Sequence, residues 1–174
     1  MKITWFGQSA LRIHLGGQVV VIDAERAGAG VDQGELRSGA DVVLALAGPH
    51  ETVDGKTWKP RPAQRLLEAG EVTRPVDVWS PGAQSVLVDA DEDMPLLVAG
   101  GPVPELGRWV ERAVVVLVGA ALADRAVTLL DRGAPRLLAL AADEAELDAT
   151  IGAIRDRLDG TGLVALEPGL AVEA

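Results

Sequence analysis

The chain has no cysteine and only two histidines, His14 and His50, among its 174 residues. The lack of cysteine excludes disulfides, thiolate metal sites, iron–sulfur clusters and cysteine nucleophiles. Two imidazoles cannot supply a site that needs three of them from one chain. Aromatic residues make up 3% of the chain, with no tyrosine. Surfaces on which nucleic-acid bases stack are therefore poorly supplied.

Basic residues are outnumbered by acidic ones, 16 against 26, which gives a formal charge of −10. A surface of this sign repels nucleic acids and anionic membranes, so we expect neither as a partner. The start of the chain lacks the pattern of a secretory signal, and the longest nearly apolar run, 113–123, is too short to span a bilayer. We therefore expect a cytoplasmic protein, folded as a single domain over residues 1–174.

The first half of the chain reads as strands. Leu11, Ile13 and Leu15 alternate with Arg12 and His14, which is the period of a strand with one buried face. Asp89, Asp91 and Asp93 indicate a solvated hairpin tip, because the residues that follow do not fit a calcium loop. We predict an N-terminal meander, a central strand and three short later strands, at 2–6, 10–15, 18–22, 41–46 and between 65 and 88.

The second half alternates strands with helices. Asp143 is a suitable N-cap with Glu146 three residues later, and Leu147, Ile151, Ile154 and Leu158 form one apolar stripe. We expect this half and the N-terminal meander to form one sheet each, packed face to face under outer helices. The predicted helices are 104–112, 122–132 and 143–158, and the predicted strands are 95–99, 114–118, 136–140, 163–166 and 170–172.

The segments 1–10 and 17–23 carry a resemblance to a known family. With the strands at 40–44, 96–101, 114–119 and 136–140 and the turn at 167–169, they resemble the metallo-β-lactamase superfamily. The most similar branch is its small, stand-alone metal-dependent hydrolases. The resemblance implies an α/β fold, a four-layer αββα sandwich trimmed in its loops and helices.

The same resemblance places the family's metal ligands on residues of which only Glu51 keeps a coordinating atom. In register from Asp41, the histidine-rich loop falls on non-histidine residues, and His50 lies between ligand positions. Small apolar side chains do not coordinate a divalent cation. The resemblance therefore implies a fold without its metal centre, with no cofactor and no catalytic residue. The vestigial cleft that it implies consists of Gln8, Asp23, Ala47, Pro49, His50, Glu51, Thr52 and Gly101.

Three functional hypotheses follow. The first is a non-catalytic binding or assembly module, in which Asp23 accepts loop N–H groups and His50 caps its own loop. The alternative is a hydrolase of the same superfamily with a site rebuilt around Asp23, His50 and Glu51. The third is a binder of an unidentified small molecule in the old cleft, lined by Ala47, Pro49, Gly101 and Ala141.

Two tryptophans suggest self-association. Trp58 and Trp79 lie in segments rich in turn residues, where burial within one domain is less assured. Exposed apolar patches tend to be covered by a partner. We therefore expect a homodimer.

Overall fold

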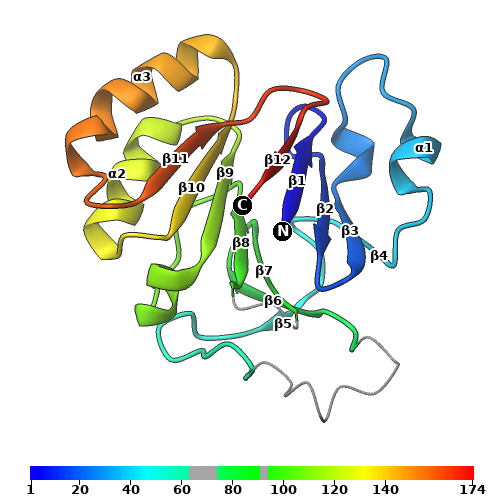
Figure 1. Cartoon of the computed structure of the whole chain (residues 1–174), viewed down its shortest axis with the longest axis horizontal. Coiled ribbons are helices and arrows are strands. Elements are labelled where there is room, and N and C mark those ends of the chain that lie inside the picture. The colour runs from blue at the N-terminus through cyan, green and yellow to red at the C-terminus, as the bar shows by residue number, and fades with distance from the viewer. Residues whose placement is uncertain (63–73, 91–93) are drawn as a thin grey trace.

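A computed structural model describes residues 1–62, 74–90 and 94–174, and they form two mixed β-sheets with helices outside them (Figure 1). The predicted α/β class is confirmed. The five-stranded sheet has the order β12-β1-β2-β3-β4. Its strands are β1 (Lys2–Trp5), β2 (Leu11–Leu15), β3 (Gln18–Ile22), β4 (Val42–Leu44) and β12 (Ala171–Glu173).

The second sheet has seven strands in the order β11-β10-β9-β8-β7-β6-β5. The run from β8 to β11 is parallel, whereas β7 pairs antiparallel with both β6 and β8. The strands are β5 (Glu51–Thr52), β6 (Asp77–Gly82), β7 (Ser85–Asp89), β8 (Leu96–Ala99), β9 (Val114–Val118), β10 (Leu137–Ala141) and β11 (Gly162–Ala165).

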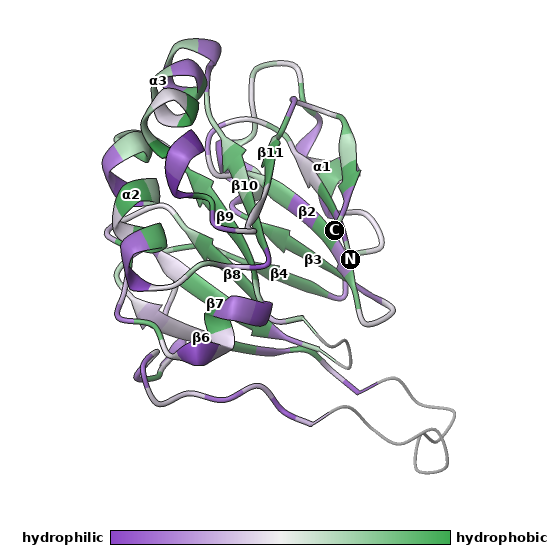
Figure 2. Cartoon of the chain, turned by 60° about the vertical axis from the view of Figure 1, so that its left-hand side comes forward, coloured by the Kyte–Doolittle hydropathy of each residue, from purple (hydrophilic) through white to green (hydrophobic). Residues whose placement is uncertain are grey.

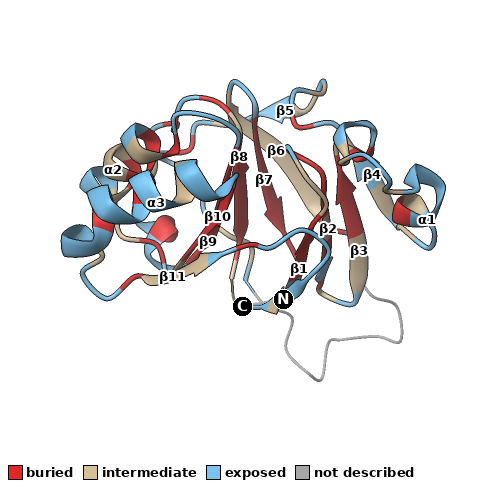
Figure 3. Ribbon diagram, turned by 90° about the horizontal axis from the view of Figure 1, so that it is seen from above, coloured by how far each residue is buried: buried red, intermediate tan, exposed pale blue. Residues whose placement is uncertain are grey.

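The main core lies between the two sheets. Side chains at alternate positions of each strand enter it, so that Leu11, Ile13 and Leu15 of β2 meet Val114 and Val116 of β9 in one buried cluster. This confirms the predicted period of β2, whose Arg12 points the other way. Figure 3 shows buried strands in the centre and exposed helix surfaces outside. Burial of these apolar faces is the main force that holds the sheets together.

Helices cover the outer face of each sheet. η1 (Ala24–Arg26) and α1 (Gln33–Arg37) pack on the five-stranded sheet, where Leu36 and Ala24 are buried against Val21. α2 (Leu122–Arg132) and α3 (Glu144–Ile154) lie on the seven-stranded sheet, with Leu129 and Ile154 buried. α2 is polar on the side away from the strands (Figure 2), whereas the exposed side of α3 mixes Glu144 and Asp148 with alanines and Ile151. The remaining 3-10 segments are η2 (Arg108–Arg112) and η3 (Arg155–Arg157).

Both ends of α2 and the start of α3 follow the sequence signals, but α3 ends at Ile154, before the predicted end at 158, and continues as the 3-10 turn η3. α2 spans 122–132 as predicted and ends before Gly133. Asp143 caps α3 by accepting the N–H of Glu146 at 2.9 Å, also as predicted. The segment 104–112 is a correction, because only 108–112 is helical and it is a 3-10 turn. Gly107 precedes it in an extended conformation, and a Cβ there would lie 2.4 Å from the carbonyl oxygen of Lys56.

The division of the chain between the sheets is a second correction. The C-terminal strand β12 joins the N-terminal meander beside β1, rather than the sheet of β9 to β11. The turn at 167–169 carries the chain across, and Gly169 N donates to Trp5 O at 2.7 Å (Figure 1). β5, β6 and β7 come from the first half of the chain but extend the seven-stranded sheet.

Two local predictions also differ from the structure. β4 was expected to be central, but it is an edge strand, and Val43 is 50% exposed. Asp89 is not part of a solvated tip, because it ends β7 with 1% of its surface exposed and accepts the N–H of Arg61 at 2.7 Å. Asp91 and Asp93, and the predicted strand that begins near residue 65, lie outside the described residues.

The tryptophans gather beside β6. The ring of Trp58 meets Trp79 at 5.6 Å and Trp109 at 5.0 Å between centroids, both edge to face. Trp109 Nε1 also donates to Gly55 O at 2.6 Å. Trp58 and Trp79 are half-buried, so each retains exposed aromatic surface while packing on the same cluster. Within the described residues, no helix has the length and apolar character needed to cross a bilayer.

Candidate functional site

A cleft of about 420 Å³ opens where four strands end. Asp23, Ala45, Gly100 and Gly119 directly follow β3, β4, β8 and β9, and all four line it. β3 runs parallel to β4, and β8 runs parallel to β9, so the carboxyl end of each strand lies beside that of its partner. The cleft therefore receives residues from both sheets, at the kind of edge where α/β proteins commonly bind ligands.

The turn between β1 and β2 forms one wall of this cleft. Trp5 Nε1 donates to Gln8 O at 2.9 Å, and Ala10 N donates to Gly7 O at 2.9 Å. The Ser9 hydroxyl donates to Asp23 Oδ2 at 2.5 Å. These three bonds fix the turn, so the exposed Gln8 side chain is presented at the mouth of the cleft.

Asp23 ties the turn after β4 to the rest of the site. Its Oδ1 accepts the N–H of Leu46 at 2.8 Å, while its own N–H donates to Leu44 O at 2.9 Å. The side chain is 10% exposed. The carboxylate thus accepts a loop N–H group, as the sequence led us to expect, and its second oxygen is held by Ser9.

The backbone around the cleft is unusual. Gln8, Asp23 and Gln84 have φ values of 46°, 47° and 52°, in the left-handed region that non-glycine residues avoid. All three line the cleft, from the β1–β2 turn, the end of β3 and the β6–β7 hairpin. Such residues cost free energy and gather at ligand-binding sites more than elsewhere. Their convergence from three segments marks this cleft out from the other cavities.

A buried arginine holds the strand ends beneath the cleft. Arg125 of α2 donates to the carbonyl oxygens of Val118 at 2.8 Å and Ala99 at 2.5 Å, the residues just before Gly119 and Gly100. Burial lowers the pKa of the Arg125 guanidinium, and the nearby carboxylate of Glu146 opposes that shift. Arg125 is therefore a positioning residue for the cleft floor.

Two charged side chains at the rim of the cleft differ in their partners: Glu25 has a close ion pair, and Arg26 has a long one. Glu25 pairs with Arg37 at 2.9 Å. Arg26 is 66% exposed in its side chain, and its Nε lies 3.9 Å from Asp23 Oδ2, the limit of an ion pair. Arg26 and the amides of Gln8 and Gln84 therefore supply the donors that a ligand could reach from solvent.

The structure brings some of the sequence-predicted site residues together and separates others. Gln8, Asp23 and Ala47 line the cleft. Pro49 and His50 do not, although His50 is close to its loop: its Nε2 lies 2.7 Å from Ala45 O, within hydrogen-bond distance. That contact suits the expected loop-capping role of His50.

Glu51 and Thr52 form β5 at the end of the seven-stranded sheet. They pair in parallel with Trp79 and Ser80, and both are exposed. Neither is among the residues that line the cleft. The side chain of Glu51 therefore belongs to a sheet edge rather than to the carboxyl ends of β3 and β4.

Gly101 has no room for the carboxylate that the family resemblance would place there. A Cβ at Gly101 would lie 2.7 Å from Ala83 O and 3.1 Å from Gln84 Cβ, so an aspartate would require the hairpin to move. The residues present do not form the metal-binding set that the resemblance implies. Among the residues that the structure describes, no three His, Asp or Glu side chains form a group able to hold a metal ion.

Several lining residues were not singled out from the sequence as members of the cleft. Leu46 and Val118 add apolar surface, and Ser9, Arg26 and Gln84 add polar groups. Gln84 comes from a hairpin turn whose only sequence signal is the Pro81-Gly82 pair before it. Its place beside Asp23 follows from the packing of the two sheets, which no local pattern specifies.

Comparison of the chain with protein-family models, with curated proteins and with solved structures finds no match.

Proposed function

We propose that this protein is a non-catalytic metallo-β-lactamase-like protein that binds a small polar molecule in the cleft at the ends of β3, β4, β8 and β9. The observation that carries the proposal is the use of Asp23. One carboxylate oxygen accepts from Leu46 N and the other from Ser9 Oγ, so both serve to build the cleft wall. With both oxygens engaged by protein donors, Asp23 holds the cleft wall in place for a ligand.

The shape of the cleft supports binding. Its walls include three left-handed non-glycine residues, a form of preorganisation that costs stability and is found where a ligand must be met by fixed groups. Arg26, Gln8 and Gln84 offer hydrogen-bond donors, whereas Leu46 and Val118 offer apolar contact. This combination suits a small polar ligand with hydrogen-bond acceptors.

The rebuilt-hydrolase alternative needs Asp23, His50 and Glu51 to converge. His50 contacts Ala45 O, and Glu51 lies on the exposed strand β5, so in this conformation the three side chains do not form one group. A hydrolase would therefore need a conformation of this loop other than the one observed.

The test is metal analysis combined with ligand screening. Protein purified without chelators should contain zinc, iron and manganese far below one ion per chain, and added metal should produce no phosphodiesterase or lactonase turnover. A thermal-shift screen of polar metabolites should find a ligand that stabilises the protein, and Ala47→Phe, which fills the cleft, should abolish that shift. One metal per chain with turnover lost in His50→Ala would overturn the proposal in favour of the hydrolase. A ligand whose shift survives Ala47→Phe would place its binding elsewhere and refute the cleft.

A further inference from the structure

A second and larger cavity runs between α3 and the connection from β11 to β12, and we call it the α3 groove. Its volume is about 940 Å³. Its surface is mainly apolar, with Trp5 and Leu166 buried at its base and Leu147 and Ile151 on the α3 side. Ile151 is 36% exposed, one of three large hydrophobic residues in the described parts of the chain that are exposed.

One face of α3 is directed to this groove. Glu144, Leu147, Asp148 and Ile151 are spaced i, i+3, i+4 and i+7, so they share one side of the helix, and all four line the groove. The apolar stripe expected from the sequence is therefore divided. Ile154 is buried in the core with α2, whereas Ile151 remains on the groove side. Nothing in the described structure covers Ile151 fully.

The groove carries a concentration of negative charge. Two of its carboxylates have structural partners: Asp143 caps α3, and Glu146 accepts the N–H of Leu122 at 2.6 Å. Glu144, Asp148 and Glu167 are exposed and, within the described residues, have no ion pair or hydrogen-bonded side-chain partner. No Lys or Arg is among the lining residues.

The arrangement of these carboxylates is unfavourable in the isolated chain. Glu144 and Asp148 are four residues apart on one helix face, a spacing at which like charges repel. The helix dipole favours acidic groups in the first turn of α3, which accounts for Glu144. It does not account for Glu167, which comes from the turn after β11 and faces the same groove.

We propose that the α3 groove docks a basic amphipathic helix of a partner protein. Apolar side chains of that helix would cover Ile151 and Leu147, and its Lys or Arg residues would pair with Glu144, Asp148 and Glu167. Charge complementarity selects this occupant: a second copy of the chain carries a formal charge of −10, and nucleic acids and anionic lipids have the same sign. In the helix-in-groove mode the docked helix supplies the apolar anchors, and the groove supplies the apolar surface that receives them, here Leu147 and Ile151 of α3. The proposal is independent of the ligand in the cleft.

The probe is a fluorescein-labelled leucine–lysine peptide of about 14 residues with leucines at helical spacing, long enough to form a helix on binding. The comparison peptides are a scrambled sequence of the same composition and a leucine–glutamate peptide of the same pattern. Fluorescence anisotropy should show that the patterned basic peptide binds and that the acidic peptide does not. The scrambled peptide should bind at least tenfold more weakly than the patterned one, because scrambling displaces at least one apolar anchor and the loss of one anchor costs about that much. Affinity should fall when NaCl is raised.

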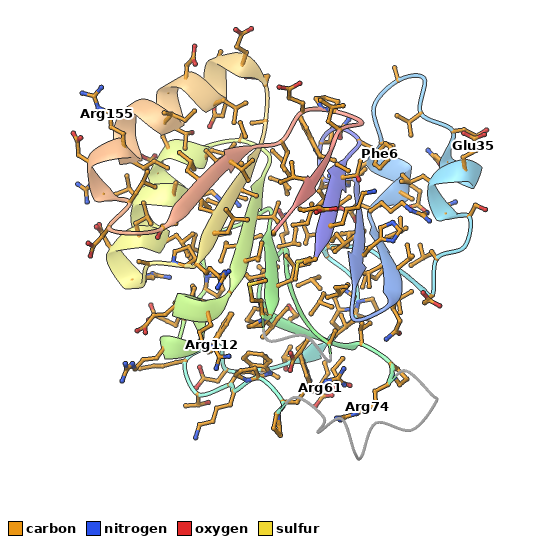
Figure 4. The ribbon with its side chains drawn as sticks, viewed as in Figure 1. Phe6, Glu35, Arg61, Arg74, Arg112 and Arg155 are labelled. Carbon is orange, nitrogen blue, oxygen red and sulfur yellow. The ribbon has the colours of Figure 1, made fainter. Side chains whose placement is uncertain are left out.

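Two groove variants and one matched control locate the binding. Ile151→Ser should lower the affinity for the patterned peptide about tenfold. The triple variant Glu144→Gln, Asp148→Asn, Glu167→Gln should also lower this affinity about tenfold. The triple variant Glu35→Gln, Glu51→Gln, Glu173→Gln makes the same change of charge outside the groove and should bind like the parent. Glu35 is on α1, across the molecule from Arg155, which follows α3 (Figure 4).

Amide chemical-shift mapping on the unsubstituted protein makes the test independent of the variants. Shifts should concentrate on α3 and on 165–168. Equal loss of affinity in the groove and control triple variants, equal binding of patterned and scrambled peptides, or shifts centred elsewhere would overturn the proposal. A protein that is dimeric in light scattering and becomes monomeric in Ile151→Ser would also overturn it, because the occupant would then be a second copy.

Discussion

Replacing Asp23 tests whether this carboxylate builds the cleft. In Asp23→Ala, the N–H of Leu46 loses its acceptor in a partly buried position, which costs about 1–3 kcal/mol, and the Ser9 hydroxyl loses its partner at about 1 kcal/mol. Alanine at φ 47° adds about 1 kcal/mol, because aspartate and asparagine tolerate the left-handed conformation better. We expect the free energy of unfolding to fall by about 3–5 kcal/mol in total.

Asp23→Asn is the matched control. Asparagine keeps an oxygen for Leu46 N and keeps the tolerance of positive φ, while the Ser9 hydroxyl can rotate to accept from the new amide. The expected loss is about 1 kcal/mol, from exchanging a charged acceptor for a neutral one. The alanine variant should thus be less stable than the asparagine variant by about 2–4 kcal/mol, which for a chain of this length corresponds to roughly 4–15 °C in melting temperature.

Urea denaturation followed by tryptophan fluorescence measures both variants, since the chain contains four tryptophans. The reasoning requires Asp23→Ala to be clearly less stable than Asp23→Asn. Two variants within about 0.5 kcal/mol of each other would refute it. That result would mean that the carboxylate does not hold the segment after β4, and Asp23 would become available for chemistry.

Three further predictions concern stability and association. Gly152→Ala should raise the free energy of unfolding by about 0.5–1 kcal/mol, because Gly152 is inside α3 and a Cβ there meets nothing within 4 Å. Gly133→Ala should lower it, because the new Cβ would lie 2.6 Å from Val110 Cγ1. Thermal melts of the two variants test both expectations. Burial raises the pKa of Asp89 above its ordinary value of 3.8, so the folded state binds this proton more tightly than the unfolded state. The free energy of unfolding should therefore fall as the pH rises from 3.8 to the higher pKa of the folded state. Urea midpoints measured against pH should lose this fall in Asp89→Asn, and an unchanged pH dependence would contradict the assignment. The protein should be a homodimer, with light scattering at tens of micromolar giving twice 18.1 kDa, and a monomer mass would contradict this.

The sequence predicts those elements whose signals are local. The alternation over 11–15 defines β2, Gly133 ends α2, and the Asp143–Glu146 pair begins α3, because each depends on residues within one or two turns of chain. Where a strand stands in its sheet is not local. Val42 to Leu44 are apolar and predict a central strand, but among the described residues no strand pairs with the outer edge of β4, and Val43 is 50% exposed.

The candidate site also depends on packing between segments that are distant in the sequence. The family resemblance places Asp23 and Gln8 in the cleft, because they occupy the strand end and the turn that it aligns with the family's site. Gln84 and Gly119 could not be named from the sequence, since they reach the cleft only when β6–β9 stack against the other sheet. Gly101 follows from the register of the resemblance alone, and the structure shows why a larger residue does not fit there: an added Cβ would lie 2.7 Å from Ala83 O.

The cleft and the α3 groove share a wall. Gln8 and Gly119 line both cavities. The bond from Trp5 Nε1 to Gln8 O fixes the turn on the groove side, and the bond from Ser9 to Asp23 fixes it on the cleft side. A ligand that shifts the β1–β2 turn from one cavity therefore changes the wall of the other. Thermodynamic linkage makes any such effect reciprocal: if a cleft ligand alters the affinity for a helix in the groove, the helix alters the affinity for that ligand by the same factor. Gln8, held in the left-handed conformation, is the residue of the β1–β2 turn that lines both cavities.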